Sequence, residues 1–523
     1  MKTKDDALRR VRNAVQCPVP TAVCRLHYAH CSLPAAYCLL PIAFCLLFTA
    51  CMVGPNYQRP SASVPAAFKE PPTDNADEIN RWKPAQPNEE AARGKWWEIY
   101  NEPDLNALEE QVNISNQNVL LAEAQFREAA DAVRIARSAL YPTITTAPSY
   151  ARSEQSGTLY NVSAGNLTGG QRNIFALPFS LSYTVDLWGS IRRNVRAGVA
   201  TAQATFAQLQ NARLSYQVAL AEDYFELQGT DGAEQLLQTT VKSYQDYLKL
   251  TQDRFSAGVA SGADVAQAQT QVKTAQAQLI DYGVARAQLE HAIAVLTGKP
   301  PAEVSITQSA IKIVPPPVPV GVPSTLLERR PDIAAAEREM ASENEQIGIA
   351  KAAYYPSLTL NASGGFEGGQ AYNFLTWPAR FWSIGPTFNY TIFDAGRRRA
   401  QVELARNAYD ATVANYRQTV LTGFQQVEDN LAALRVLENE AAAEDEAVRA
   451  AQDALNISTY QYKAGTVDYL TVITEQAILL NDQVQAVNIL TRRMTASALL
   501  VEALGGGWNS STLPTANDLE HGK

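Results

Sequence analysis

The chain of 523 residues contains two copies of one pattern. Three short segments recur 207 residues further along, and their glycines pair as Gly189 with Gly396, Gly258 with Gly465, and Gly298 with Gly505. A constant offset over more than one hundred residues predicts two structural units of the same kind. Upstream the offset is 214, so the first copy holds seven additional residues, which predict a loop within 151–173.

Each copy contains a segment in which apolar and small polar residues alternate strictly. The alternation covers 175–187 in the first copy and 382–392 in the second, and each is preceded by a weaker segment, 143–150 and 357–366. Period two is the pattern of a strand with one apolar face, in a soluble sandwich or in a membrane barrel. Length and aromatic content favour the barrel, because about 9 to 11 tilted residues cross a bilayer. Four strands cannot close a barrel alone, so several chains must contribute.

Long helices are predicted after these strands. The segment from Ser190 to Phe255 is rich in Ala, Gln, Glu and Leu, lacks proline, and is interrupted only by Gly198, Gly229 and Gly232. A continuous helix of that length reaches about 100 Å, which no globular core requires. A coiled-coil stalk is the alternative, but it leaves the alternating strands unexplained.

Residues 1–50 have the character of a removable leader. Basic residues precede an apolar segment, 32–50, which two prolines make unsuitable for a membrane-spanning helix but which suits the apolar region of a signal. The small pair Thr49–Ala50 precedes Cys51, so the leader resembles a bacterial lipoprotein signal that leaves Cys51 as the lipidated first residue. Five leader cysteines at seven-residue spacing are interpreted as a duplicated leader segment rather than as metal or disulfide chemistry.

Catalysis and nucleic-acid binding are not indicated. The formal net charge is −9, an acidic balance that suits nucleic acid poorly. Beyond the leader only His291 and His521 remain, and His291 lies among apolar residues at helical spacing. The glycine-rich run 363–370 lacks the Lys and Ser/Thr of a phosphate-binding loop. We therefore expect no enzyme activity, no metal, no nucleic-acid partner and no cofactor other than the covalent lipid on Cys51.

Four motifs carry a resemblance to a known family. They are CMVGPNYQRP (51–60), LLERRPDIAAAE (326–337), AYYPSLTL (353–360) and the paired turns AGV and AGT. With the duplicated order of elements, the chain resembles the outer-membrane factor family of TolC-like efflux proteins and its NodT lipoprotein branch. The resemblance implies an α+β membrane protein with two internal repeats. Four strands from each chain of a homotrimer would form a 12-stranded outer-membrane β-barrel that continues into a long periplasmic α-helical coiled-coil barrel.

The resemblance also implies a function. Such a trimer is a passive exit duct of a tripartite efflux system of the RND type, recruited by a periplasmic adaptor (membrane fusion protein) and an inner-membrane pump. It would be lipid-anchored in the bacterial outer membrane, with a large periplasmic portion. The alternatives are a channel for type I protein secretion and a non-conducting lipoprotein that scaffolds the envelope. The implied segments are a leader (1–50), a lipidated tether (51–95), a first efflux repeat (96–310), a proline-rich linker (311–325), a second repeat (326–507) and a polar C-terminal tail (508–523).

The functional residues implied by the resemblance lie at the turns between long helices. Asp264 and Tyr462 match positions whose cross-links hold the tunnel closed, and we expect a hydrogen bond from Tyr462 of one chain to Asp264 of its neighbour. Where well-studied members carry two aspartates, this chain has Thr471 and Thr474. The implied adaptor contacts are Ala257, Gly258, Val259, Ala464, Gly465 and Thr466, and the implied gate residues are Asp264, Tyr462, Asp468, Thr471, Thr474 and Glu475.

The run ERRPD, residues 328–332, predicts the start of a helix. Proline suits the first helical turn, and an aspartate suits the positive end of the helix dipole. The sequence also allows an ion pair of either Arg329 or Arg330.

Overall fold

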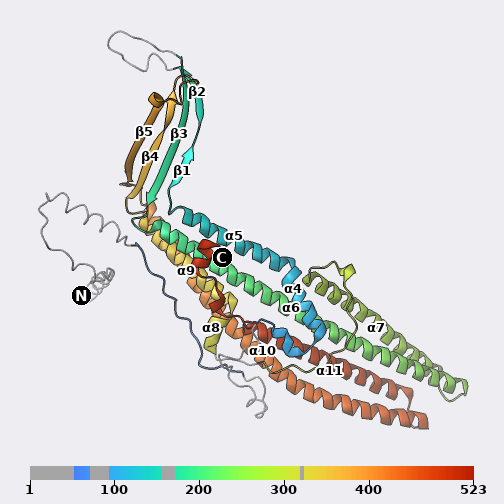
Figure 1. The fold of residues 1–523 in the computed structure, drawn as a ribbon. Coiled ribbons are helices and arrows are strands. Elements are labelled where there is room, and N and C mark those ends of the chain that lie inside the picture. Colours follow the sequence, from blue (N-terminus) through green and yellow to red (C-terminus); the bar gives the residue numbers. More distant parts are fainter. Residues whose placement is uncertain (1–51, 71–93, 155–170, 319–322, 523) are drawn as a thin grey trace, which may run out of the picture. The chain divides into compact units, whose positions relative to one another are not determined.

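The computed structural model describes residues 52–70, 94–154, 171–318 and 323–522 (Figure 1). The leader, Cys51, part of the tether, residues 155–170 of the expected loop and part of the proline-rich linker lie outside these ranges. Within the described ranges, no helix is long and apolar enough to cross a membrane.

The same order of elements occurs twice along the chain (Figure 1). The first half runs α5 (Gln117–Ser138), β1 (Thr143–Thr146), β2 (Ser149–Glu154), β3 (Gln171–Val185), α6 (Ser190–Ser256) and α7 (Gly262–Leu296). The second half runs α9 (Pro331–Ala352), β4 (Ser357–Gly368), β5 (Arg380–Asn389), α10 (Arg397–Ala464) and α11 (Tyr469–Ala503). The shorter elements are η2 (Trp96–Tyr100), α4 (Pro103–Ser115), η3 (Pro301–Glu303), η4 (Pro323–Thr325), α8 (Leu326–Arg329), η5 (Trp377–Ala379), η6 (Ser510–Thr512) and α12 (Ala516–His521).

The strands form one antiparallel sheet in the order β1–β3–β4–β5, with β2 also paired to β3. Thr146 of β1 lies opposite Phe179, and Ser149 of β2 lies opposite Ala176. β1 and β2 therefore occupy a single strand position that is interrupted at Pro148, a residue without the amide that a strand ladder needs. The sheet thus has the four strand positions that the alternation predicts. Within the window 151–173, in which the insertion was expected, residues 151–154 and 171–173 are strand, and residues 155–170 lie outside the described part of the chain.

One face of the sheet is apolar and exposed. Residues directly opposite one another in antiparallel strands share a face. One row joins Phe179, Gly364 and Trp382, and the next joins Leu181, Ala362 and Ile384. Trp382 and Ile384 are 77% and 75% exposed in the single chain. Exposed apolar side chains of this size indicate that the face meets something other than water.

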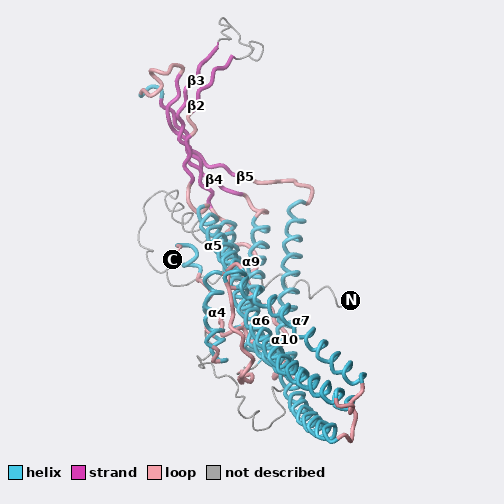
Figure 2. The backbone as a smooth tube through the Cα atoms, turned by 90° about the vertical axis from the view of Figure 1, so that its right-hand side faces the viewer, coloured by secondary structure: helices cyan, strands magenta, loops and turns pink. Residues whose placement is uncertain are grey.

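The first long helix is continuous through its three glycines, as the predicted reach of the segment requires. Helix α6 is continuous over 67 residues and includes Gly198, Gly229 and Gly232. At Gly229 a Cβ atom would lie 2.2 Å from Thr491 Oγ1 of α11. This glycine therefore permits close helix packing rather than a turn. Helices α6 and α7 form one hairpin and α10 and α11 a second (Figure 1), and Figure 2 shows the helical region turned by 90°.

The ERRPD run begins a helix, as predicted. Arg330 is the residue before α9, and Pro331 is its first residue. The Arg330 guanidinium binds the Asp332 carboxylate at 2.7 Å and donates to the carbonyl of Ala503, the last residue of α11, at 2.9 Å. The ion pair allowed for Arg329 or Arg330 is therefore made by Arg330. The same side chain links the start of α9 to the end of α11.

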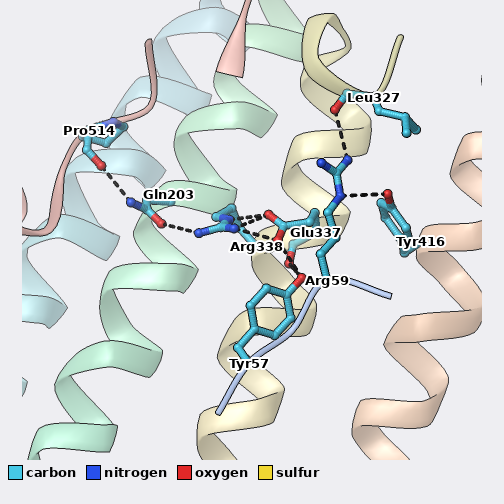
Figure 3. A network of polar contacts seen from close by, with 8 residues as sticks. All are labelled: Tyr57, Arg59, Gln203, Leu327, Glu337, Arg338, Tyr416 and Pro514. Carbon is cyan, nitrogen blue, oxygen red and sulfur yellow. Dashed lines mark hydrogen bonds and ion pairs between the residues drawn. The ribbon is translucent and has the colours of Figure 1, made fainter. Parts of the chain in front are cut away.

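Residues 52–70 form an extended strap without helix or strand, and Figure 3 shows its contacts at Tyr57 and Arg59 with the helices. The Tyr57 hydroxyl donates to Glu337 of α9 at 2.6 Å, and Arg59 Nε donates to the Tyr416 hydroxyl of α10 at 3.1 Å. On the far side of Glu337, Arg338 contacts Gln203 of α6. A polar network therefore connects the strap to both halves of the chain.

The C-terminal residues, expected only as a polar tail, are folded. Leu519 of α12 is buried among Val133 of α5 and Val195 of α6. Arg137 of α5 donates to the carbonyl of Glu520 at 2.8 Å. A single buried leucine in a short polar segment is too weak a pattern to predict this docking.

Candidate functional site

The two helical hairpins end in turns of the same geometry. Gly258 and Gly465 have φ of +74° and +77°, the left-handed conformation in which glycine is favoured. The Val259 amide donates to the carbonyl of Arg254 at 2.9 Å, and the Thr466 amide donates to that of Gln461 at 3.0 Å. A Cβ on either glycine would meet no atom within 4 Å. The backbone conformation therefore requires glycine at each tip, and the space beside it is open.

The helix that follows each tip is capped differently. Ser261 and Asp264 form a reciprocal capping box at the start of α7, in which Asp264 accepts from the Ser261 amide at 2.8 Å. Asp468 caps α11 by accepting from the amide and the hydroxyl of Thr471, at 3.1 and 2.8 Å. The hydrogen bond from the Thr471 side chain lowers the pKa of Asp468, so this exposed carboxylate is charged at neutral pH. Both tips thus use an aspartate to cap the following helix. Asp264 accepts from the Ser261 amide, whereas Asp468 accepts from both the amide and the hydroxyl of Thr471.

Thr474 and Glu475 lie one turn further along α11. The Thr474 hydroxyl donates to the carbonyl of Leu470 at 2.9 Å, a contact within its own helix. Glu475 is half-buried on the same helix. Among the candidate gate residues, only Asp468 and Thr471 are joined directly to each other by hydrogen bonds in the described part of the chain.

Tyr462 lies inside the chain, between the two hairpins. Its side chain is 4% exposed and packs against Tyr469, with ring centroids 5.3 Å apart. Its hydroxyl lies 3.4 Å from Thr251 Oγ1 of α6. Arg254 Nη1 donates to the Tyr462 carbonyl at 3.1 Å, and the guanidinium lies 4.6 Å from the Tyr462 ring centroid. Arg254 therefore holds the end of α10 against α6 through two contacts.

The hydrogen bond expected between Tyr462 and Asp264 of a neighbouring chain stays a prediction. Within one chain, the Tyr462 hydroxyl is near Thr251, and the Asp264 carboxylate accepts from Ser261. Sequence reasoning missed the face of α6 that makes these contacts. Its members recur at helical spacing, a signal that was available: Tyr244, Tyr247, Thr251 and Arg254.

The segment after Cys51 is fixed at the junction between sheet and helices. The Val53 amide donates to the carbonyl of Trp188 at 3.1 Å. Gly189 has φ of +75°, and a Cβ there would lie 2.6 Å from Met52 Cγ. Met52 is therefore packed beside the turn between β3 and α6, although Cys51 itself lies outside the described residues.

Among the residues that the structure describes, no group of three or more His, Cys, Asp or Glu side chains is placed to bind a metal ion.

Comparisons with known proteins agree on one family. The family model for outer membrane efflux proteins matches residues 108–299 and 322–506. The chain belongs to the outer membrane efflux protein family. Among relatives of this efflux family, the chain is 30% identical over 483 residues to the probable efflux pump outer membrane protein TtgC of Pseudomonas putida, covering 88% of this chain and 94% of the relative.

A second relative and a solved structure are also similar to this chain. Nodulation protein T of Rhizobium leguminosarum bv. trifolii is 30% identical over 474 residues, covering 88% of this chain and 96% of that protein. The solved structure of the outer-membrane channel OprN superposes with a TM-score of 0.77 at 25% identity, covering 88% of this chain and all of that chain. The predicted membership of the TolC-like efflux family and its NodT branch is confirmed, and the family is one of channels rather than enzymes.

Proposed function

We propose that three copies of this chain form the exit duct of a tripartite efflux pump in the outer membrane. The observation that carries the proposal is the sheet, which combines an exposed apolar face with unpaired outer strands. Backbone groups left unpaired at a sheet edge are costly in lipid. Pairing β5 of one chain with β1 and β2 of the next removes every edge, and three chains then give a 12-stranded barrel.

The helical hairpins supply the rest of the duct. Hairpins α6–α7 and α10–α11 have nearly equal helices, of 67 and 35 residues and of 68 and 35 residues. Three chains contribute six such hairpins, which would enclose a tunnel through the periplasm. The open space beside Gly258 and Gly465 suits contact with a periplasmic adaptor, which in turn recruits the inner-membrane pump. We place the adaptor contacts at Ala257–Val259 and Ala464–Thr466.

Relatives indicate the class of cargo. Two proteins of Pseudomonas putida that are 30% identical to this chain are described as an antibiotic and a toluene efflux pump outer membrane protein. We therefore propose drugs and other small apolar molecules as the exported substrates. The pump, which is a separate protein, would provide the energy and select the cargo.

Single-channel recording tests this function. Purified protein, shown to be trimeric, is added to planar lipid bilayers. We expect discrete conductance steps when the tips open, because the open duct is continuous across the barrel; Arg254→Gln, expected to open more often, gives the most sensitive recording. A trimer that inserts but gives no conductance would support the scaffold alternative and contradict the exit duct.

We further propose that a lipid on Cys51 anchors the chain. Met52 packs beside the turn at the helical end of β3, so an acyl chain on the preceding residue would start at the periplasmic rim of the barrel. The Cys51→Ser variant is expected to accumulate unprocessed and without acyl mass, as measured by intact-protein mass spectrometry. Mature wild-type protein that carries no lipid, or that begins at another residue, would contradict the proposal.

The gate proposal places closure at the hairpin tips, with Arg254 and Tyr462 as its central contact. Replacing Arg254 by Gln removes the cation over the Tyr462 ring and weakens the hydrogen bond to its carbonyl, interactions worth about 0.5–2 and 1.5–3 kcal/mol. We expect Arg254→Gln to raise the spontaneous open probability by about tenfold or more in bilayers. Tyr462→Phe retains both contacts and should change it little.

The same recordings distinguish the contact between Arg254 and Tyr462 from the hydrogen bond expected between neighbouring chains. If the hydrogen bond from Tyr462 to Asp264 of a neighbouring chain closes the tunnel, then Tyr462→Phe and Asp264→Ala should open it while Arg254→Gln should not. Well-studied members carry aspartates at the positions of Thr471 and Thr474. In this chain, three copies of the charged Asp468 would instead provide the negative charge at the tunnel entrance.

A further inference from the structure

The apolar face of the sheet carries an arginine near one end. Arg380 is the first residue of β5 and lies opposite Phe366 of β4, which lies opposite Leu177 of β3. Because directly opposed residues share a face, Arg380 belongs to the apolar face. The next row on that face contains Phe179 and Trp382.

This end of the sheet is the one away from the helices (Figure 1). β3 and β5 lead into α6 and α10 at their C-terminal ends, whereas Arg380 begins β5. The inference rests on the proposed function, in which the helices occupy the periplasm and the apolar face meets lipid. Arg380 then lies at the level of the outer leaflet.

Arg380 has aromatic neighbours. Its guanidinium carbon lies 3.6 Å from the ring centroid of Trp377, a residue that is 73% exposed. Among the described residues, no Asp or Glu lies within ion-pair distance of it. At the helical end of the sheet, by contrast, Arg192 pairs with Asp186 at 3.0 Å and Arg398 with Asp394 at 2.6 Å.

A second arginine lies on the same face and at the same end. Arg152 of β2 is opposite Asn173, two residues from the pair of Tyr150 and Phe175, and Glu154, opposite Gln171, follows on the same face. Closing β5 onto β1 and β2 of the next chain would bring Arg380 and Arg152 to one seam of the barrel. With Glu154 beside Arg152, the seam has two cations and one carboxylate; the remaining positive charge is tolerated only near the interface and favours an anion there.

We propose that Arg380 and Trp377 bind a phosphate of an anionic glycolipid in the outer leaflet, one at each seam of the trimer. The planar guanidinium can donate two parallel hydrogen bonds to a phosphate, and tryptophan is favoured at the headgroup level. The apolar rows directly below would contact the acyl chains, which favours a lipid over free phosphate. Arg152 contributes positive charge from the neighbouring chain.

Native mass spectrometry of the detergent-purified trimer tests the proposal. The probes are bis-phosphorylated lipid A and its dephosphorylated form. We expect the wild-type trimer to retain the phosphorylated lipid preferentially and Arg380→Gln to lower the bound fraction by about tenfold. The matched control is Arg172→Gln, which removes a charge at the same end but from the opposite face, since Arg172 pairs with Ser153. It should bind as wild type does.

The outcomes are distinguishable. Equal retention by Arg380→Gln and wild type, or equal retention of the two lipids by wild type, overturns the proposal. Loss of trimer in both Arg380→Gln and Glu154→Gln, with lipid binding unchanged in the remaining trimer, overturns it in favour of an ion pair between chains. A wild-type protein that never forms a trimer would instead refute the proposed function.

Discussion

The Phe179→Arg substitution is expected to prevent assembly of the trimer. Phe179 is half exposed in the single chain and lies on the apolar face, between the rows that contain Leu177 and Leu181. A charge on the lipid-facing side of a barrel costs about 2–4 kcal/mol at the bilayer midplane and less toward the interface, and Phe179 lies one row inside the row of Arg380. Each of the three chains would bear that cost, so Phe179→Arg should leave little heat-resistant trimer in outer-membrane fractions.

The adjacent residue provides the control. Ser180 lies opposite Thr145 and Ser363, on the small polar face that would line the lumen. Ser180→Arg introduces the same side chain one residue away, where water can solvate it, and should assemble to a trimer at close to the wild-type yield. Equal loss of trimer in both variants would show that the two faces have been misassigned or that the sheet does not contact lipid.

Glu345→Ala is expected to destabilise each chain by about 3–5 kcal/mol. Glu345 of α9 accepts a hydrogen bond from Arg193 of α6 at 2.6 Å, and the arginine side chain is 1% exposed. The other two guanidinium nitrogens, Nε and Nη2, have no hydrogen-bond partner in the described structure. Removing the carboxylate leaves a buried positive charge without compensation. Thermal melting of the helical signal in detergent should therefore shift downward markedly.

Two further variants show whether burial is the cause. Glu403 pairs with Arg406 at 2.7 Å, and both side chains are about half exposed. Glu403→Ala should cost at most about 1 kcal/mol, because water screens that pair. The double variant Arg193→Met with Glu345→Met should recover most of the loss, since paired apolar replacements of a buried ion pair are often neutral. A melt of the double variant no better than that of Glu345→Ala would contradict this account.

The elements of the fold were predictable because they follow simple periods. The alternation at 175–187 and 382–392 identified β3 and β5 to within a few residues, and the proline-free segment from Ser190 identified α6 to within one residue at its end. The role of the glycines in α6 could not be predicted, because a glycine that ends a helix and one that admits a neighbouring helix have the same local sequence. Only the approach of Thr491 to Gly229 distinguishes them.

The contacts of the candidate gate residues were less predictable, because they depend on how separate helices pack. The resemblance identified Tyr462, but not that α6 would bury it. Arg254 precedes the first tip by four residues and contacts a carbonyl 208 residues away. No local pattern specifies that register, although the helical spacing of Tyr244, Tyr247, Thr251 and Arg254 marks the face involved. The docking of Leu519 was missed for the same reason.

The strap has a consequence for the order of folding. Tyr57 binds a residue 280 positions away, and Arg59 binds one 357 positions away. A chain that emerges from its N-terminus cannot form either contact until α9 and α10 have followed. Such long-range contacts require large loops to close and therefore form late. Residues 57–59 therefore stay undocked until α9 and α10 have folded, and their docking marks the completion of the helical scaffold.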